Sequence, residues 1–515
     1  MANVFEQQRR NVIPGFRNYA DTLELRELDD ARADRRIVAE PDLSGLVLDW
    51  EAAPSVGVAA DLLSCALVAG IRDIGPVKDA ARFIFDHDLE ASGLQLELAR
   101  RFMGLAFQSP KVVPLVRLTS FIEAASRSHL NQLIRQLRRA LLRFERNPVI
   151  YTELARLFAI LGRKDKAGRC MSIAVGLAGD NRYVLRSAAR LWASNGEPDR
   201  ARELLLRSSA TTEDPWLISA EIALATLTKR SPRLAKRGSI VVTSGRFAPF
   251  SLAELSCGLG TLELLDGNRR RSRELFRAAL RAPNDNALAQ VEWALSVERL
   301  FDVDLDKFDV KRDFEAVALE AVAKSNWLRA IEYAEKWFLD MPFAKRPVML
   351  GSHLASTILE NGADTAITFC RAGLVSHPRD PQLLNNLAYA LALKGKSEEA
   401  AREIEGISLD SLGNATQICL TATKGLIAFR RGNAVEGRAL YLAAIDLATR
   451  MKLTAYGQIA FLNYAREEIT SGSSFAGTVA DKVLRLEPHP GVPGLAVLAD
   501  RVRRLSEKTR DYPKP

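Results

Sequence analysis

The chain has few of the residues that build metal centres, disulfide frameworks and cofactor sites. Its five cysteines stand singly, at positions 65, 170, 257, 370 and 419, and form neither a CxxC motif nor an even set. We therefore expect reduced thiols that pack as small apolar groups. The five histidines are scattered, and no pair has the spacing of metal ligands. The sequence predicts no metal site and no cofactor.

Motifs of nucleophilic, metal-assisted and phosphate-transfer catalysis are also missing. The sequence contains no GxxxxGK[ST], GxSxG or HExxH. We interpret His87, in "FDHD", as a solvated helix end, and His377, before Pro378, as a helix cap. The GxG of "GLGTLELLDG" lies inside a helical pattern, where Gly260 serves as a small packing residue. The sequence therefore predicts no enzyme activity and no catalytic residue.

Long apolar runs are absent as well. The weakly charged stretch "VAADLLSCALVAGI" is too short and too interrupted to span a bilayer. The opening "MANVFEQQRRNVIPGF" lacks the apolar core of a signal peptide. We expect a cytoplasmic protein without membrane insertion.

The residues that are abundant favour helices. The 515 residues are 47% hydrophobic, 26% charged and only 7% aromatic, and Ala, Leu and Arg are frequent. This length exceeds one compact core, so several domains or an extended array are expected. The formal net charge of +9 is modest for so long a chain, and it permits an anionic partner without requiring one.

A helix–turn–helix pattern is clear in "DPQLLNNLAYALALKGKSEEA", residues 380–400. Leu384, Leu387 and Leu391 fall on one helix face. Gly395 then ends the run, and Ala400 belongs to a second run. The stretch predicts two short antiparallel helices that approach closely at their alanines.

The same order of residues recurs earlier in the chain. It is found in "NPVIYTELARLFAILGRKDKAGRCMSIA" and again in "RYVLRSAARLWASNGEPDRARELLLRS". Gly162 and Gly196 are 34 residues apart, and so are Ala167 and Ala201. Two anchors with the same period indicate a true repeat.

This pattern resembles the tetratricopeptide repeat, a 34-residue helix–turn–helix unit. The resemblance is clearest at 147–214 and 380–405, and looser copies lie in 252–379 and 415–450. It implies an all-α fold, an α-solenoid of helix–turn–helix repeats wound into a right-handed superhelix with a concave groove.

The remaining segments lack the repeat. Residues 120–146, "SFIEAASRSHLNQLIRQLRRALLRFER", predict one long amphipathic helix. The predicted organisation is an N-terminal extension (1–58), an N-terminal helical region (59–146), the repeat array (147–450), C-terminal capping helices (451–507) and a tail (508–515).

In the family, the first helix of each repeat lines the groove. The resemblance places on this concave side Thr152, Arg156, Tyr183, Arg186, Arg190, Gln382, Asn385, Asn386 and Tyr389. Guanidinium groups bind carboxylates and phosphates bidentately, so the three arginines predict selection of negative charge. Asn386 matches an asparagine with which some family members clamp a C-terminal carboxylate, but the lysines of that clamp are absent. The competing interpretation is an ordinary solvated helix face.

Two arginine-dense segments, "RQLRRALLRFER" and "GNRRRSRELFRAALR", favour a second function. Helical spacing would let them track a phosphate backbone through Arg135, Arg139, Arg143, Arg146, Arg269, Arg270, Arg273 and Arg277. Leucines alternate with these arginines and no aromatic residues are interleaved for base stacking, as in a solvated face of an amphipathic helix.

The leading hypothesis is a non-enzymatic scaffold or adaptor that binds a partner protein or peptide in the groove. The alternatives are a nucleic-acid-binding repeat protein and a regulatory subunit of an enzyme encoded elsewhere. On this hypothesis, Arg186→Glu with Arg190→Glu leaves folding intact and removes partner binding. Leucine at Ala167 or Ala201 damages folding by separating the helices.

Overall fold

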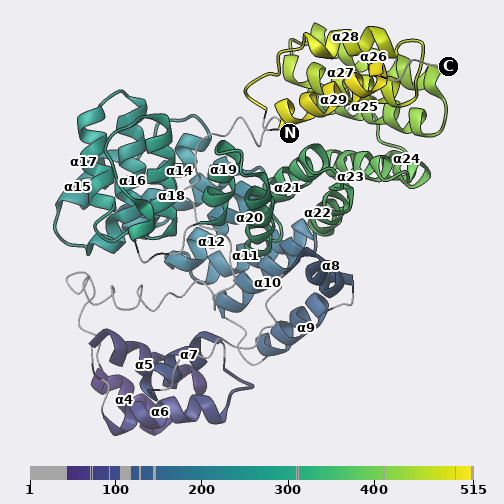
Figure 1. Ribbon diagram of the computed structural model, residues 1–515. Helices are drawn as coiled ribbons and strands as arrows, with labels where there is room; N and C mark the ends of the chain where they lie inside the picture. Colours follow the sequence, from purple (N-terminus) through teal and green to yellow (C-terminus); the bar gives the residue numbers. More distant parts are fainter. Residues whose placement is uncertain are drawn as a thin grey trace.

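A computed structural model describes residues 43–511, apart from 70, 72–73, 92, 105–116, 127–128, 143–146, 309, 311–312, 410–411 and 493 (Figure 1). All regular elements in this described part are helical, as the sequence predicts.

The described residues between 43 and 307 form fifteen α-helices and two 3₁₀ turns, η1 and η2. They are α4 (Leu43–Ala52), α5 (Val56–Ala69), α6 (Gly75–Asp86), α7 (Gly93–Phe102), α8 (Leu118–Ser126), α9 (His129–Leu141), α10 (Pro148–Ile160), α11 (Lys164–Leu177), α12 (Arg182–Ser194), α13 (Pro198–Arg207), η1 (Ser209–Thr212), α14 (Pro215–Leu227), α15 (Ala235–Thr243), α16 (Pro249–Leu265), α17 (Arg269–Ala279), α18 (Asp285–Val297) and η2 (Leu305–Lys307).

The C-terminal half continues the series of paired helices. They are α19 (Phe314–Ala323), α20 (Trp327–Asp340), α21 (Lys345–Ile358), α22 (Ala363–Ser376), α23 (Pro381–Leu393), α24 (Ser397–Ile404), α25 (Asn414–Arg430), α26 (Ala434–Arg450), α27 (Thr454–Thr470), α28 (Ala476–Leu484) and α29 (Leu495–Asp511).

Helix pairs are defined by the turn residues that the sequence predicts. The turn glycines Gly162, Gly196, Gly267, Gly395 and Gly432 have φ between 67° and 86°. This left-handed conformation suits glycine, which has no Cβ to clash with the backbone. The prediction of these turns is confirmed.

The predicted close approach of paired helices is also confirmed. Ala167, Ala201 and Ala400 have no exposed surface, and each lies in the second helix of its pair. A Cβ on Gly260 of α16 would lie 3.3 Å from the ring of Phe276 on α17. Small residues at these crossings set the distance between the helices.

The stack of pairs does not run straight from end to end. After α18, the chain returns so that α8 packs against both α20 and α22, and α10 contacts α22 (Figure 1). The Phe121 and Phe338 rings meet edge to face, with centroids 5.3 Å apart. A Cβ on Gly162 would lie 2.8 Å from the Ser376 carbonyl oxygen. Repeats about 200 residues apart in sequence are therefore in contact.

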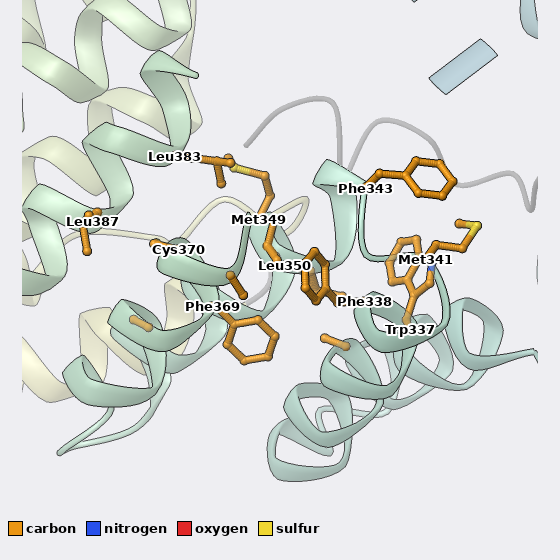
Figure 2. Packing of buried hydrophobic residues seen from close by; sticks show 14 of the residues in the cluster. Trp337, Phe338, Met341, Phe343, Met349, Leu350, Phe369, Cys370, Leu383 and Leu387 are labelled. Atoms are coloured by element: carbon orange, nitrogen blue, oxygen red, sulfur yellow. The ribbon is translucent and has the colours of Figure 1, made fainter. Parts of the chain in front are cut away.

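This return joins buried residues of α8–α14 and of α19–α29 in one hydrophobic core cluster. Figure 2 shows part of it, with Phe338 of α20, Leu350 of α21 and Phe369 of α22. Gly351 makes room for the Phe369 ring, because a Cβ there would lie only 2.4 Å from the ring. The α16–α18 region has a separate core cluster, and so do helices α4–α7.

The structure differs from the sequence predictions in two places in the N-terminal part, the helix predicted over 120–146 and the extension 1–58. The single helix predicted over 120–146 is wrong: α8 and α9 are separate helices, because α8 packs on α22 whereas α9 packs on α10. Helix α4 occupies part of the predicted extension 1–58, of which residues 1–42 lie outside the described part. At the other end, α27, α28 and α29 complete the stack. Within the described residues, no helix combines the length and apolar character that a membrane span requires.

Candidate functional site

The predicted groove residues of the first clear repeat are occupied by contacts within the chain. Thr152 has no exposed surface, and its hydroxyl donates to the Pro148 carbonyl oxygen of its own helix at 2.9 Å. Glu153 accepts from Arg156 Nε and from the Tyr183 hydroxyl, both at 3.1 Å. Thr152, predicted on the concave side, is therefore buried, and Arg156 and Tyr183 share a carboxylate of this chain.

The next predicted groove residue, Arg186, lies in a buried polar cluster. Its Nη2 donates to Glu254 Oε2 at 2.7 Å, and its guanidinium lies 4.8 Å from the centre of the Trp216 ring. The side chains of Arg186 and Glu254 are only 11% and 2% exposed. Asn284 and Asn286 donate to the other Glu254 oxygen at 2.8 and 2.9 Å. The carboxylate thus has a full set of donors.

Arg190 is also turned inward, with 9% of its surface exposed. Its Nη2 lies 3.6 Å from the sulfur of Met341, which belongs to the returning part of the chain. The arginine-lined acceptor predicted from the sequence is therefore not an open surface. The returning chain covers Arg190 through Met341, whereas α16, which precedes the return, covers Arg186 through Glu254.

The predicted groove residues of α23 are in a different situation. The Gln382 amide donates to the Thr416 hydroxyl at 3.1 Å, and the Asn386 amide to the Ser352 hydroxyl at 3.2 Å. Both bonds join neighbouring first helices at a separation of 34 residues. Asn385, Asn386 and Tyr389 all lie on the wall of a pocket, which brings together the second set of predicted residues.

This pocket encloses about 710 Å³, counting its open mouth. The first helices of successive pairs, α21, α23, α25 and α27, supply most of its wall, and α26 and α29 complete it. The lining residues are His353, Ser356, Thr357, Asn385, Asn386, Tyr389, Ile418, Cys419, Ala422, Thr423, Tyr441, Tyr456, Ile459, Ala460, Asn463, Val492, Leu495 and Leu498.

Asn385 stands out among these residues. It is only 4% exposed, and its Oδ1 is buried without a hydrogen-bond partner in the described structure. It lines both this pocket and a smaller adjoining one of about 260 Å³. By contrast, the Tyr389 hydroxyl donates to Asn463 Oδ1 at 2.7 Å. Buried polar groups are usually paired, so the Asn385 amide is free to form a hydrogen bond with a group that enters the pocket.

The pocket has mainly apolar walls and neutral polar groups. Its described lining includes no Lys, Arg, Asp or Glu. Burial raises the pKa of the Cys419 thiol to about 11, so this thiol is protonated near neutral pH and is a poor nucleophile. In the described residues, no group of three or more His, Cys, Asp or Glu could hold a metal ion. Apolar walls with a few neutral polar groups are typical of sites that bind an uncharged group.

The C-terminal helix α29 supplies a wall that repeat patterns do not predict. Leu495 and Leu498 face the pocket, and Arg501 Nη2 donates to the Ile358 carbonyl oxygen of α21 at 2.6 Å. This bond joins residues 143 apart. No local sequence signal places α29 against α21, because the contact depends on the curvature of all the intervening pairs.

Glu254 and Glu221 are buried residues that the sequence interpretation missed. Glu221 has no exposed surface and accepts from Arg202 Nε at 2.8 Å. Both carboxylates sit inside apolar helices, α14 and α16. A lone acidic residue in such a run is a usable signal, because a buried charge needs a partner.

The basic segments remain on the surface but do not combine into one stripe. Arg135 and Arg139 are exposed on α9, while Arg143 and Arg146 lie outside the described residues. On α17, two arginines form ion pairs: Arg269 pairs with Glu298, and Arg270 pairs with Glu274 at 3.5 Å. The Arg277 guanidinium lies over the Phe301 ring, and Arg273 is exposed. Helices α9 and α17 lie in separate regions of the molecule (Figure 1).

The histidines singled out from the sequence occupy helix ends. His87 follows α6, with its Nδ1 2.9 Å from the Phe83 carbonyl oxygen and its ring stacked on Phe83. His377 is the C-cap of α22 and its Nε2 donates to the Phe343 carbonyl oxygen at 2.9 Å. Both interpretations as helix ends are confirmed.

No family model matches the chain, and no curated protein does. Several solved structures show similarity. Yeast Tom70 is 15% identical, over 76% of this chain and 96% of that one, with a TM-score of 0.27. The TPR domain of P58(IPK) is 14% identical, over 70% and 88%, with a TM-score of 0.23. The human IFIT1 dimer with PPP-AAAA is 14% identical, over 93% and 95%, with a TM-score of 0.31.

The repeat type of this chain follows from its own helices. Paired helices recur along the described chain, and a spacing of 34 residues separates the left-handed turn glycines Gly162 and Gly196. The same spacing separates the buried alanines Ala167 and Ala201, and again Ala366 and Ala400. The described part of the protein is therefore an all-α array of helix–turn–helix repeats.

Proposed function

We propose that the chain is a non-enzymatic interaction scaffold that binds a segment of a partner protein at the pocket between α21 and α29. The observation that carries the proposal is Asn385, a buried amide without a partner on the wall of a largely apolar pocket. Ligand sites in proteins typically combine apolar walls with a few placed polar groups.

The position of the pocket supports a role in protein binding. Four successive first helices contribute to one face, which is the surface that stacked helix pairs use for partners. The corresponding face of the earlier repeats is filled by pairs such as Arg186 with Glu254. The pocket is thus a part of this face that offers space.

Binding of nucleic acid receives less support. Arg269 and Arg270 are paired with glutamates, and α9 and α17 lie apart (Figure 1). The predicted arginines that the structure describes, on α9 and α17, therefore do not form the continuous basic path that backbone tracking requires. A role as a regulatory subunit is a special case of the scaffold and depends on the partner's identity.

The proposal is tested by filling the pocket. Ala422 lines it from α25, and we expect Ala422→Trp to remove binding of a partner captured from the source cell's extract. Ala439, exposed on the paired helix α26, provides the matched control Ala439→Trp. Circular dichroism melting shows whether each variant folds.

Mass spectrometry of the captured material, at low and high salt and with nuclease, separates the alternatives. We expect one protein that survives salt and nuclease with the wild type and Ala439→Trp, but not with Ala422→Trp. Equal capture by Ala422→Trp contradicts the pocket as the binding site. Loss of all bound material with nuclease favours nucleic acid instead.

A further inference from the structure

We infer that this pocket selects an uncharged group: a large apolar side chain of the partner, inserted together with its own backbone amide, with Asn385 as the specificity-determining residue. The inference rests on the proposed function and defines the chemistry of its ligand. It departs from the charge selection predicted from the groove arginines.

The first argument is the absence of charge from the described pocket wall. A carboxylate or ammonium group that entered would lose its hydration without gaining an oppositely charged Lys, Arg, Asp or Glu on the described wall. Two neighbouring arginines share one carboxylate: Arg466 Nε donates to Glu467 Oε1 at 2.8 Å, and Arg430 Nε lies 2.9 Å from Glu467 Oε2. Arg466 Nη1 lies 3.5 Å from the Tyr389 hydroxyl, and Arg466 Nη2 is buried without a hydrogen-bond partner in the described structure. Neither arginine is among the residues that line the pocket. A charged side chain or a free chain terminus inside the pocket therefore meets no Lys, Arg, Asp or Glu on its described wall, and is a poor ligand.

The second argument is the apolar surface. Ile418, Ile459, Leu495 and Leu498 come from different helices and converge on the same space. The rings of tyrosines on α26 and α27 add to it. A large aromatic or branched aliphatic side chain covers such a surface and removes it from water.

The third argument concerns hydrogen bonds. Asn386 and Tyr389 are bonded to Ser352 and Asn463, whereas the Asn385 amide remains available. A side-chain amide carries one acceptor and two donors, and rotation about its last torsion turns either toward the pocket. It can therefore pair with the N–H and C=O of a peptide unit. A site that contains an unpaired buried polar group favours ligands that satisfy it.

The fourth argument is the shape of the site. Helix α29 reaches α21 through Arg501 and Ile358, and a Cβ on Gly494 would lie 2.7 Å from Ile358 Cδ1. With this contact in place, a partner helix cannot lie along the whole groove between α21 and α29. The partner contributes an inserted side chain, flanked by a short stretch of its backbone.

Three small probes test this chemistry on the full chain. N-acetyl-tryptophanamide has the ring, the amides and no charge; N-acetyl-tryptophan adds a carboxylate; 3-methylindole lacks the amides. Dissociation constants come from calorimetry or from saturation-transfer NMR. We expect the uncharged amide to bind about tenfold more tightly than either of the other two, since one good hydrogen bond or one avoided buried charge has that magnitude.

Asn385→Leu keeps the approximate volume and removes the amide. We expect this variant to retain 3-methylindole binding while its preference for N-acetyl-tryptophanamide falls toward unity. Asn414, which is exposed at the start of α25, provides the control Asn414→Leu with unchanged preferences. Equal binding of the three probes by the wild type, preference for the carboxylate, or an unchanged preference in Asn385→Leu overturns the inference.

The capture experiment separates this inference from the proposed function. If Ala422→Trp loses the partner but the wild type shows no preference for N-acetyl-tryptophanamide, the proposed scaffold function stands and the selection of an uncharged ligand is refuted. The probe preference combined with unchanged capture by Ala422→Trp identifies a small-molecule pocket and refutes a partner side chain. Light scattering that shows self-association in the wild type but not in Ala422→Trp assigns the site to a second copy, and this also overturns the proposal.

Discussion

The Arg186 guanidinium and the Glu254 carboxylate meet at 2.7 Å, joining α12 to α16 across 68 residues of sequence. The pair lies almost fully inside the molecule, against the Trp216 ring. The repeat pattern predicts that Arg186 lines a binding groove, but in the structure it is paired with a carboxylate of the same chain. Its contribution is to hold first helices of different repeats together.

Reversing the charge at Arg186 should therefore destabilise the protein. Arg186→Glu leaves Glu254 buried without its cation and adds a second carboxylate, and breaking a buried pair costs about 3–5 kcal/mol. Chemical denaturation measures this loss. Arg207→Glu, at an exposed position of α13, should change the free energy of unfolding by less than about 1 kcal/mol. An intact free energy of unfolding in Arg186→Glu would restore the groove interpretation.

The contact between Gly351 and Phe369 makes a second prediction. A Cβ on Gly351 would lie 2.4 Å from a ring that is 1% exposed, so the ring cannot swing into solvent. Gly351→Ala should lower the free energy of unfolding by about 1–3 kcal/mol through overpacking. Gly168→Ala on α11, where no atom lies within 4 Å of the added Cβ, should be neutral or stabilising by up to about 1 kcal/mol. Equal effects of the two substitutions would contradict the packing argument.

The Ala201 crossing makes a third prediction. Ala201 has no exposed surface, so Ala201→Leu must separate α12 from α13. We expect a loss of about 1–3 kcal/mol in the free energy of unfolding. Glu203→Leu, at a 69% exposed position of the same helix, should have little effect. Thermal melts of the two variants that coincide would refute the close approach.

His377 makes a prediction about pH. Burial lowers the pKa of the His377 imidazole, although the hydrogen bond to the Phe343 carbonyl partly opposes this, and Lys164 and Lys345 lower it further while Asp380 raises it. The unfolded chain, with a pKa near 6.5, then binds the proton more readily than the folded chain. The stability linked to His377 is present above about pH 6.5 and is lost as the pH falls below that value.

Replacing this imidazole isolates its contribution. Glutamine keeps a donor at the position of Nε2 but does not titrate, so His377→Gln should show a smaller loss of stability between pH 7.5 and 5.5 than the wild type. Urea midpoints at several pH values measure the difference. His489→Gln, at an exposed position, is the control. Parallel pH profiles for the wild type and His377→Gln would show that His377 is not the group responsible.

The sequence predicts the repeats because they depend on local chemistry. Turn glycines such as Gly162 and Gly196 must adopt a left-handed backbone conformation, and alanines such as Ala167 and Ala201 must fit where two helices cross. Both residue types therefore recur at a regular spacing in the sequence. The same repeat pattern at residues 380–400 identifies α23 as the first helix of its helix–turn–helix pair. It thereby places Asn385 on the face that carries the pocket.

The tertiary structure alone decided which parts of that face stay open. The return of α19–α22 against α8 and α10 buries Arg190 beside Met341, and α29 closes the other end of the groove near Ile358. These contacts join residues more than 140 positions apart, and they follow from small rotations added up over many helix pairs. The local sequence therefore determined the helices, their turns and their inner faces, while the accumulated geometry determined which inner faces could bind a partner.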